Sequence, residues 1–124
     1  MSSVSKVEFR AIFEGKGEAK LNLYRHLSPV TMNNILMQTK FAGRIVRFQD
    51  VFIYAPLGII VGVEKARRQF KRGEVAFMSS SGAICFFLKE ASVGVSMNPL
   101  GEVSSGMDVV EKCGVGDTVL LIKE

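Results

Sequence analysis

The sequence has no tryptophan, one histidine and two cysteines among its 124 residues, and these shortages exclude several kinds of site. The single histidine, His26, lies just before a helix start, where an exposed loop histidine is typical, so a Ser/His/Asp triad has little basis. Neither a CxxC pair nor a Cys/His cluster occurs, which leaves no basis for a zinc site. Cys85 lies in an apolar run and is expected to be a buried, reduced thiol. Because glycine-rich phosphate-binding loops are also missing, we predict neither a metal nor another cofactor.

Long hydrophobic runs are absent as well. The longest, such as residues 57–63, fall far below the roughly 20 residues that a membrane-spanning helix needs. Four charged residues within positions 1–15 leave no signal-peptide core, so we predict a cytoplasmic protein that does not contact membranes. A chain that is 48% hydrophobic and 23% charged is expected to fold, and its length predicts one domain over residues 1–124.

Alternation of apolar and polar residues is what the sequence does have. Residues 7–13 and 19–23 alternate around Gly15-Lys16-Gly17, which predicts a hairpin. Ser28 and Pro29 predict a helix start, with the helix ending near Thr39. The pattern leaves residues 57–63 as a loop or bulged strand, 64–72 as a helical turn or exposed connection, and 89–98 as a loop. Further strands are predicted at residues 43–48, 51–55, 73–79, 83–88, 100–103 and 117–122. About eight strands with two short helices favour a barrel or a sandwich.

Three segments resemble the cyclophilins, a family of proline isomerases. Residues 100–103 (Leu-Gly-Glu-Val) and 106–110 (Gly-Met-Asp-Val-Val) are similar to the family's Phe-Gly-x-Val segment and the helix that follows it. Residues 29–31 (Pro-Val-Thr) and the hairpin at 73–88 occur in the family's order. The resemblance implies a mainly β fold: a closed antiparallel barrel of about eight strands with a short helix capping each end, as in the compact cyclophilin-like proteins of prokaryotes.

The same resemblance implies a binding cleft on the barrel. Isomerising an Xaa–Pro bond means lowering a rotational barrier of ~20 kcal/mol, which the family does with an apolar proline pocket and an arginine beside the twisted amide. Arg44 matches that arginine, and Phe87 matches the pocket phenylalanine. Ser79 stands where the family has asparagine, and Met78 and Met97 are expected to complete an adaptable apolar groove. Arg44 is thus the catalytic candidate, and the other four are the ligand-binding candidates.

Several family positions are changed in this chain. The family's tryptophan and histidine have no counterpart before residue 100, and Cys85 replaces a cleft glutamine. The resemblance therefore implies a domain that binds a peptide or small ligand with weak or no isomerase activity. An active peptidyl-prolyl isomerase is the alternative.

Residues 65–72 contain the densest cluster of charge, five basic residues in eight. By neutralising phosphates these residues would give a basic nucleic-acid-associated protein, with Phe70 stacking on a base. An acidic protein partner explains the run as well as nucleic acid does, but a short basic run is more commonly a solvated face, and the net charge of +4 is mild. The pattern does not specify an oligomeric state. The basic residues are Lys65, Arg67, Arg68, Lys71 and Arg72.

Overall fold

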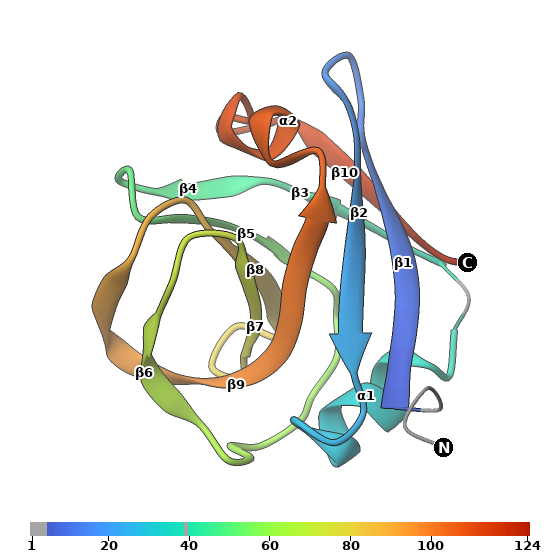
Figure 1. Ribbon diagram of the computed structural model, residues 1–124, viewed down its shortest axis with the longest axis vertical. Coiled ribbons are helices and arrows are strands. Elements are labelled where there is room, and N and C mark those ends of the chain that lie inside the picture. Colours follow the sequence, from blue (N-terminus) through green and yellow to red (C-terminus); the bar gives the residue numbers. More distant parts are fainter. Residues whose placement is uncertain (1–4, 39) are drawn as a thin grey trace.

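The computed structural model describes residues 5–38 and 40–124, and these residues form ten strands and two short helices (Figure 1). The prediction of a mainly β fold is confirmed. The helices are α1 (Pro29–Ile35) and α2 (Met107–Glu111). The strands are β1 (Lys6–Phe13), β2 (Gly17–Tyr24), β3 (Lys40–Arg44), β4 (Val46–Phe48), β5 (Phe52–Pro56), β6 (Arg67–Phe70), β7 (Glu74–Met78), β8 (Ala83–Phe87), β9 (Ala91–Ser105) and β10 (Thr118–Lys123).

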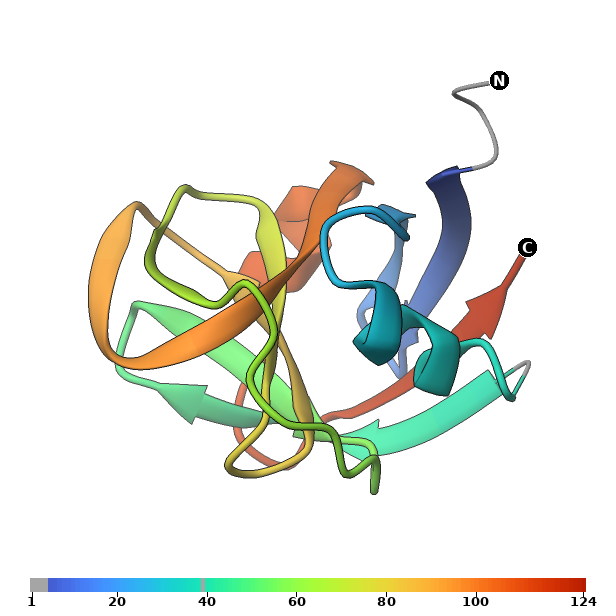
Figure 2. The ribbon, with the colours of Figure 1, turned by 90° about the horizontal axis from the view of Figure 1, so that it is seen from below.

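Nine strands form one antiparallel sheet in the order β3-β10-β1-β2-β9-β7-β8-β5-β4, and the sheet curls around a central core (Figures 1 and 2). The N-terminal hairpin shows why these residues form strands. Every second residue of β1 is buried, and Phe9 lies opposite the buried Leu21 of β2. This period-2 burial confirms the hairpin that the alternation predicted.

The prediction of an eight-stranded closed barrel is wrong in strand number and in closure. The sheet begins at β3 and ends at β4, and these strands do not pair with each other within the described residues. They are two halves of one predicted strand, interrupted at Ile45. The Ile45 N–H donates to the carbonyl of Asp117, and the Ile45 carbonyl accepts from the N–H of Gly116. These hydrogen bonds extend the pairing of β3 with β10 by one residue, and the next residues, in β4, pair with β5 instead. The chain thus passes directly from one edge strand of the sheet to the other, although the described residues of the two edge strands do not pair.

Two other predicted segments also differ from the structure. Residues 67–70 form β6 rather than a helical turn or an exposed connection, and residues 91–98 belong to the 15-residue strand β9 rather than to a loop. The first part of β9 pairs with β6, while its later part pairs with β2 and β7. Both segments are stabilised by a partner distant in sequence, which local alternation does not reveal.

Both helices are short, and the side chain of the N-cap residue caps neither of them. Ser28 is at the N-cap of α1, but its Oγ donates to the carbonyl of Pro99 instead of accepting from the helix. α1 ends at Ile35, before the predicted end near Thr39, a residue outside the described ranges. Gly106, with φ of +85°, precedes α2. Across the described residues, no helix is long and apolar enough to span a membrane.

Buried apolar side chains form two clusters on opposite faces of the sheet. The larger cluster fills the interior of the curled sheet, with Phe13 and Phe86 in edge-to-face contact. The smaller, which we call the outer cluster, contains Phe52, Phe70, Ala76, Met78, Ala83, Cys85, Phe87, Val93 and Met97. It lies where β6 and the first part of β9 fold back over β5, β7 and β8.

Candidate functional site

A chain of aromatic rings organises the outer cluster. Phe87 of β8 stacks on Phe70 of β6 with ring centroids 4.6 Å apart, and its other neighbour is Phe52 of β5 at 5.3 Å. Phe52 in turn stacks on Phe48 of β4 at 5.1 Å and contacts Tyr54 at 5.8 Å. The rings pass from the fully buried Phe87 to Phe48, whose exposed fraction is 46%. The cluster therefore opens to solvent at its β4 end.

An apolar groove of about 260 Å³ lies at that open end. Four strands contribute to it, because antiparallel pairing of β4 with β5 places Phe48 opposite Phe52 and Val46 opposite Tyr54. Gly94 forms part of the rim, where an added Cβ would meet no atom within 4 Å. The lining residues are Phe48, Phe52, Tyr54, Met78, Val93, Gly94 and Val95.

Three of the predicted site residues come together in the outer cluster, but only Met78 lines the groove. Phe87 and Met97 are completely buried beneath it. Ser79 is half-buried and starts the turn after Met78. Arg44 is exposed at the end of β3, opposite Thr118, and does not line the groove. The roles assigned to these residues stay predictions.

Sequence reasoning missed most of the residues that line the groove. Phe52 and Tyr54 alternate with the core residues Ile53 and Ala55, so two aromatic side chains share the opposite face of β5. That alternation was a usable signal, since a second apolar face on one strand needs a second layer to cover it. Val93 and Val95 carried no comparable signal because their strand pairs with distant residues.

The groove is uncharged. None of its lining residues is charged, and the Tyr54 hydroxyl is the only polar side-chain group among them. The guanidinium of Arg67 lies over the Phe70 ring, 4.4 Å from its centroid, but it pairs with Glu74 at 2.7 Å. The arrangement can hold an apolar group by burial and ring contacts, and it offers no free cation to a bound amide.

A partly buried polar network supports the sheet near α1. Glu64 accepts hydrogen bonds from the N–H groups of Val30 and Thr31 and from the Thr31 hydroxyl. Asn98 accepts from the Glu64 N–H and donates to Thr31 Oγ1 and to the carbonyl of Gly62. Glu64 thus supplies the α1 cap that Ser28 does not. The network joins β9, α1 and the segment before β6.

The hydrogen bonds to Glu64 predict a pH dependence of stability. Desolvation acts to raise the pKa of Glu64, but the three hydrogen bonds outweigh it and hold the pKa below its ordinary value of 4.5. The carboxylate therefore adds stability above the unfolded-state pKa, and the contribution disappears as pH falls through the folded-state pKa. We expect Glu64→Gln to lower the free energy of unfolding by about 1 kcal/mol at neutral pH.

Urea denaturation of both proteins at neutral and acidic pH checks this expectation. The difference between wild type and Glu64→Gln should begin to shrink near pH 4.5, where the unfolded-state carboxyl gains its proton, and should shrink further until the folded-state carboxyl is protonated as well. Glu90→Gln, at an exposed position, is the control and should change little. An equal loss at both pH values would contradict the role of the carboxylate charge.

The basic run from Lys65 to Arg72 is partly neutralised. Arg67 pairs with Glu74, and Arg72 pairs with Glu111. Lys65 donates to the carbonyl of His26, and Arg68 donates to the Ser96 hydroxyl. Ion pairing thus leaves less positive charge for phosphates than the sequence implied, and a nucleic-acid partner stays a prediction.

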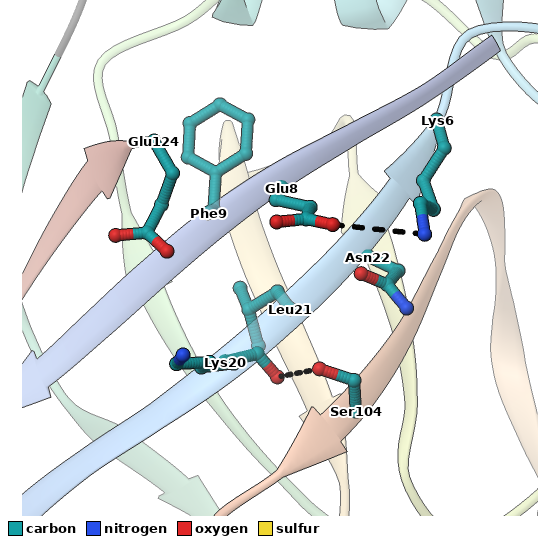
Figure 3. Close-up of a pocket in the computed structure, with 8 residues that line it drawn as sticks. All are labelled: Lys6, Glu8, Phe9, Lys20, Leu21, Asn22, Ser104 and Glu124. Carbon is teal, nitrogen blue, oxygen red and sulfur yellow. Dashed lines mark hydrogen bonds and ion pairs between the residues drawn. The ribbon is translucent and has the colours of Figure 1, made fainter. Parts of the chain in front are cut away.

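A second depression, of about 270 Å³, lies across the outer face of β1, β2 and the end of β9. Figure 3 shows its charged and polar side chains spread along these strands. Lys6 pairs with Glu8 at 3.6 Å, and the Ser104 hydroxyl donates to the carbonyl of Lys20. Its lining carries both signs of charge without convergence on one point, so we do not assign it a ligand.

The remaining reactive groups are inert or exposed. His26 is exposed and bonds to Ser5 through Nδ1. Both cysteines are free and buried, as predicted for Cys85. Burial raises the pKa of Cys113 to about 11 and raises that of Cys85 as well, so neither thiol ionises near neutral pH. In residues 5–38 and 40–124, no group of three or more His, Cys, Asp or Glu residues could hold a metal.

Comparison with known proteins identifies the fold. No protein-family model matches the chain, and no curated protein matches its sequence. A hypothetical protein from Archaeoglobus fulgidus, known from a solution structure, has a TM-score of 0.81 at 21% identity, over 97% of this chain and 96% of that one. The cyclophilin-type peptidyl-prolyl cis-trans isomerase of Cryptosporidium parvum has a TM-score of 0.70 at 11% identity, over 96% and 98%.

A third solved structure is McbB in complex with tryptophan, with a TM-score of 0.78 at 9% identity, over 94% of this chain and 44% of McbB. At these identities the likeness concerns the fold alone. The protein therefore has a cyclophilin-like fold, in agreement with the resemblance noted in its sequence.

Proposed function

We propose that this protein is a cyclophilin-like binding domain whose apolar groove takes one aromatic or proline side chain of a peptide, or a small aromatic molecule, with weak or no isomerase activity. The observation that carries the proposal is the open, uncharged groove beside the aromatic chain. Phe48 and Val95 expose 46% and 37% of their surface at its rim, although both are large apolar residues. A ligand that covers them would remove this surface from water.

The size of the groove indicates what fits. Its volume of about 260 Å³ is slightly below the range of about 300–1,000 Å³ that is typical of drug-sized ligands. One large side chain is therefore a better match than a cofactor. An aromatic ring buries roughly 150–250 Å², which offsets the cost of association only in part, so binding should be weak.

The neighbours in fold support this class of ligand. One is a cyclophilin-type peptidyl-prolyl isomerase, and McbB was solved in complex with tryptophan. An Xaa–Pro segment and an aromatic amino acid both present a compact apolar ring. Both are therefore suitable probes for the groove of this protein.

We expect proline-containing peptides or tryptophan to shift the NMR signals of the groove residues at millimolar concentration. Phe48→Ser should weaken binding roughly tenfold, because a half-exposed ring at the rim is lost while the core stays intact. Val115→Ser is a suitable control, since Val115 is 76% exposed and lies outside the groove. Shifts confined to other surfaces, or none at millimolar ligand, would refute the proposal.

Isomerisation of a standard Ala-Pro tetrapeptide should be weak or undetectable. Arg44 does not line the groove, no charged group replaces it there, and the chain has no tryptophan. Losing one well-aimed donor costs an enzyme about 3 kcal/mol, or roughly a hundredfold in rate. A protease-coupled or NMR exchange assay measures the rate. Cyclophilin-level turnover that disappears in Arg44→Ala would instead support the active isomerase.

A further inference from the structure

The connection between β5 and β6 contains a segment whose backbone is largely unpaired. Its two ends are fixed, because the Leu57 N–H donates to the carbonyl of Gly82 and the Glu64 N–H donates to Asn98 Oδ1. Between them, the N–H groups of residues 58–63 have no protein acceptor among the residues that the structure describes. We call residues 57–63 the linker segment. In Figure 2 it passes in front of the curled sheet on its way from β5 to β6.

The linker segment exposes large apolar side chains. Ile59 and Val61 are buried in the interior core, whereas Ile60 between them is 96% exposed and Val63 is 69% exposed. Val30 of α1, 55% exposed, lies next to it, because its N–H donates to Glu64. An almost fully exposed isoleucine among neighbouring exposed valines is a surface that gains free energy when it is covered.

A comparison with β6 shows that this surface is unprotected. Among the described strands, β6 pairs only with β9, so it has a free edge, but Arg67 and Arg68 place positive charge on it. Charged residues on an edge are a common defence against unwanted strand pairing. The linker segment has no charge, and its β-branched residues favour strand pairing. The linker segment therefore lacks the charge that protects the free edge of β6.

The order of residues in the linker segment fits a partner of the same sequence. Residues 58–62 read Gly-Ile-Ile-Val-Gly, which is nearly symmetric about Ile60. We propose that two copies of this protein associate through antiparallel pairing of their linker segments, with a two-fold axis at Ile60. Ile60 then lies opposite Ile60 of the second copy, and Ile59 lies opposite Val61. A two-fold interface needs such self-complementarity.

The absence of charge favours a second copy as the partner, and the small paired stretch makes the dimer weak. Uncharged segments face each other without desolvating a charge, whereas an acidic or basic partner would find no complementary group along residues 57–63. Gly58, with φ of +75°, turns the chain and limits the paired stretch to a few residues. A standard interface takes about 20–30 residues a side, so this dimer is weak and forms in concentrated solution.

Sedimentation velocity of the full chain from micromolar to submillimolar concentration tests the association. Wild type should convert from monomer to dimer over this range, and Ile60→Lys should raise the dissociation constant at least roughly tenfold, because it places like charges on the axis. Val115→Lys, at another exposed valine, should behave as wild type. A monomer at every concentration, larger aggregates only, or a dimer unaffected by Ile60→Lys would overturn the proposal.

Cysteine cross-linking tests the register. Directly opposed residues in an antiparallel pair have Cα atoms about 4.5–5.5 Å apart, within reach of a disulfide. Ile60→Cys should therefore form a covalent dimer under a mild oxidant, while Cys85 and Cys113 stay buried and unreactive. In Val63→Cys the two thiols would lie six residues apart along the ladder, roughly 20 Å, and should not cross-link. Equal cross-linking of both variants would refute the two-fold pairing at Ile60.

Discussion

Gly101→Ala is expected to lower the free energy of unfolding by about 4 kcal/mol or more, the largest effect of any substitution proposed for this protein. Gly101 lies in β9 between Leu23 of β2 and Val75 of β7. A Cβ at this position would lie 1.9 Å from the carbonyl oxygen of Asn22 and 3.0 Å from the Cα of Leu23. Both are backbone atoms, which cannot rotate away as a side chain can. The added methyl group must separate β9 from β2 in the centre of the sheet.

Chemical denaturation followed by circular dichroism measures this loss, and β9 itself provides the control. Gly94 is in the same strand, but an added Cβ there would meet nothing within 4 Å. Gly94→Ala should change the free energy of unfolding by less than about 0.5 kcal/mol. If Gly101→Ala were as mild as Gly94→Ala, β9 could not pass as close to β2 as the structure shows.

Phe87→Ala should cost about 3–5 kcal/mol of stability, because it removes the ring at the centre of the outer cluster. Phe87 is completely buried and contacts the rings of Phe70 and Phe52 on its two sides. These neighbours belong to different strands and cannot both collapse into the cavity. The ring therefore attaches β6 to the main sheet and supports the groove from below.

A substitution at the rim of the groove shows whether an aromatic ring stabilises the fold or binds the ligand. Phe48→Ala removes a ring that is 46% exposed and should cost much less stability than Phe87→Ala. Urea denaturation and a ligand titration of both variants give the comparison. A stable Phe87→Ala variant that has lost ligand binding would show that Phe87 is the floor of an open cleft, as its match to the family's pocket phenylalanine implied.

Local patterns predicted much of the fold because they reflect burial on one side of a strand. The β1–β2 hairpin follows from alternating residues joined by a glycine turn. α1 follows from Ser28 and Pro29, although its cap is provided by Glu64, more than 30 residues away in the chain. The cyclophilin-like arrangement was recognisable from short segments such as residues 100–103. The interruption at Ile45 was not, because it depends on hydrogen bonds with Gly116 and Asp117.

The sequence by itself determined a mainly β fold, a buried Cys85 and the scarcity of catalytic groups. Each of these depends on composition or on the alternation of neighbouring residues. The tertiary structure decided which residues form the groove, because Phe48, Phe52 and Val93 are brought together by the pairing and register of separate strands. It also decided that Phe87 is covered, since Phe70 reaches it only when β6 pairs with β9. Burial of one face is a local property of a strand, whereas the neighbour of a side chain depends on contacts distant in the chain.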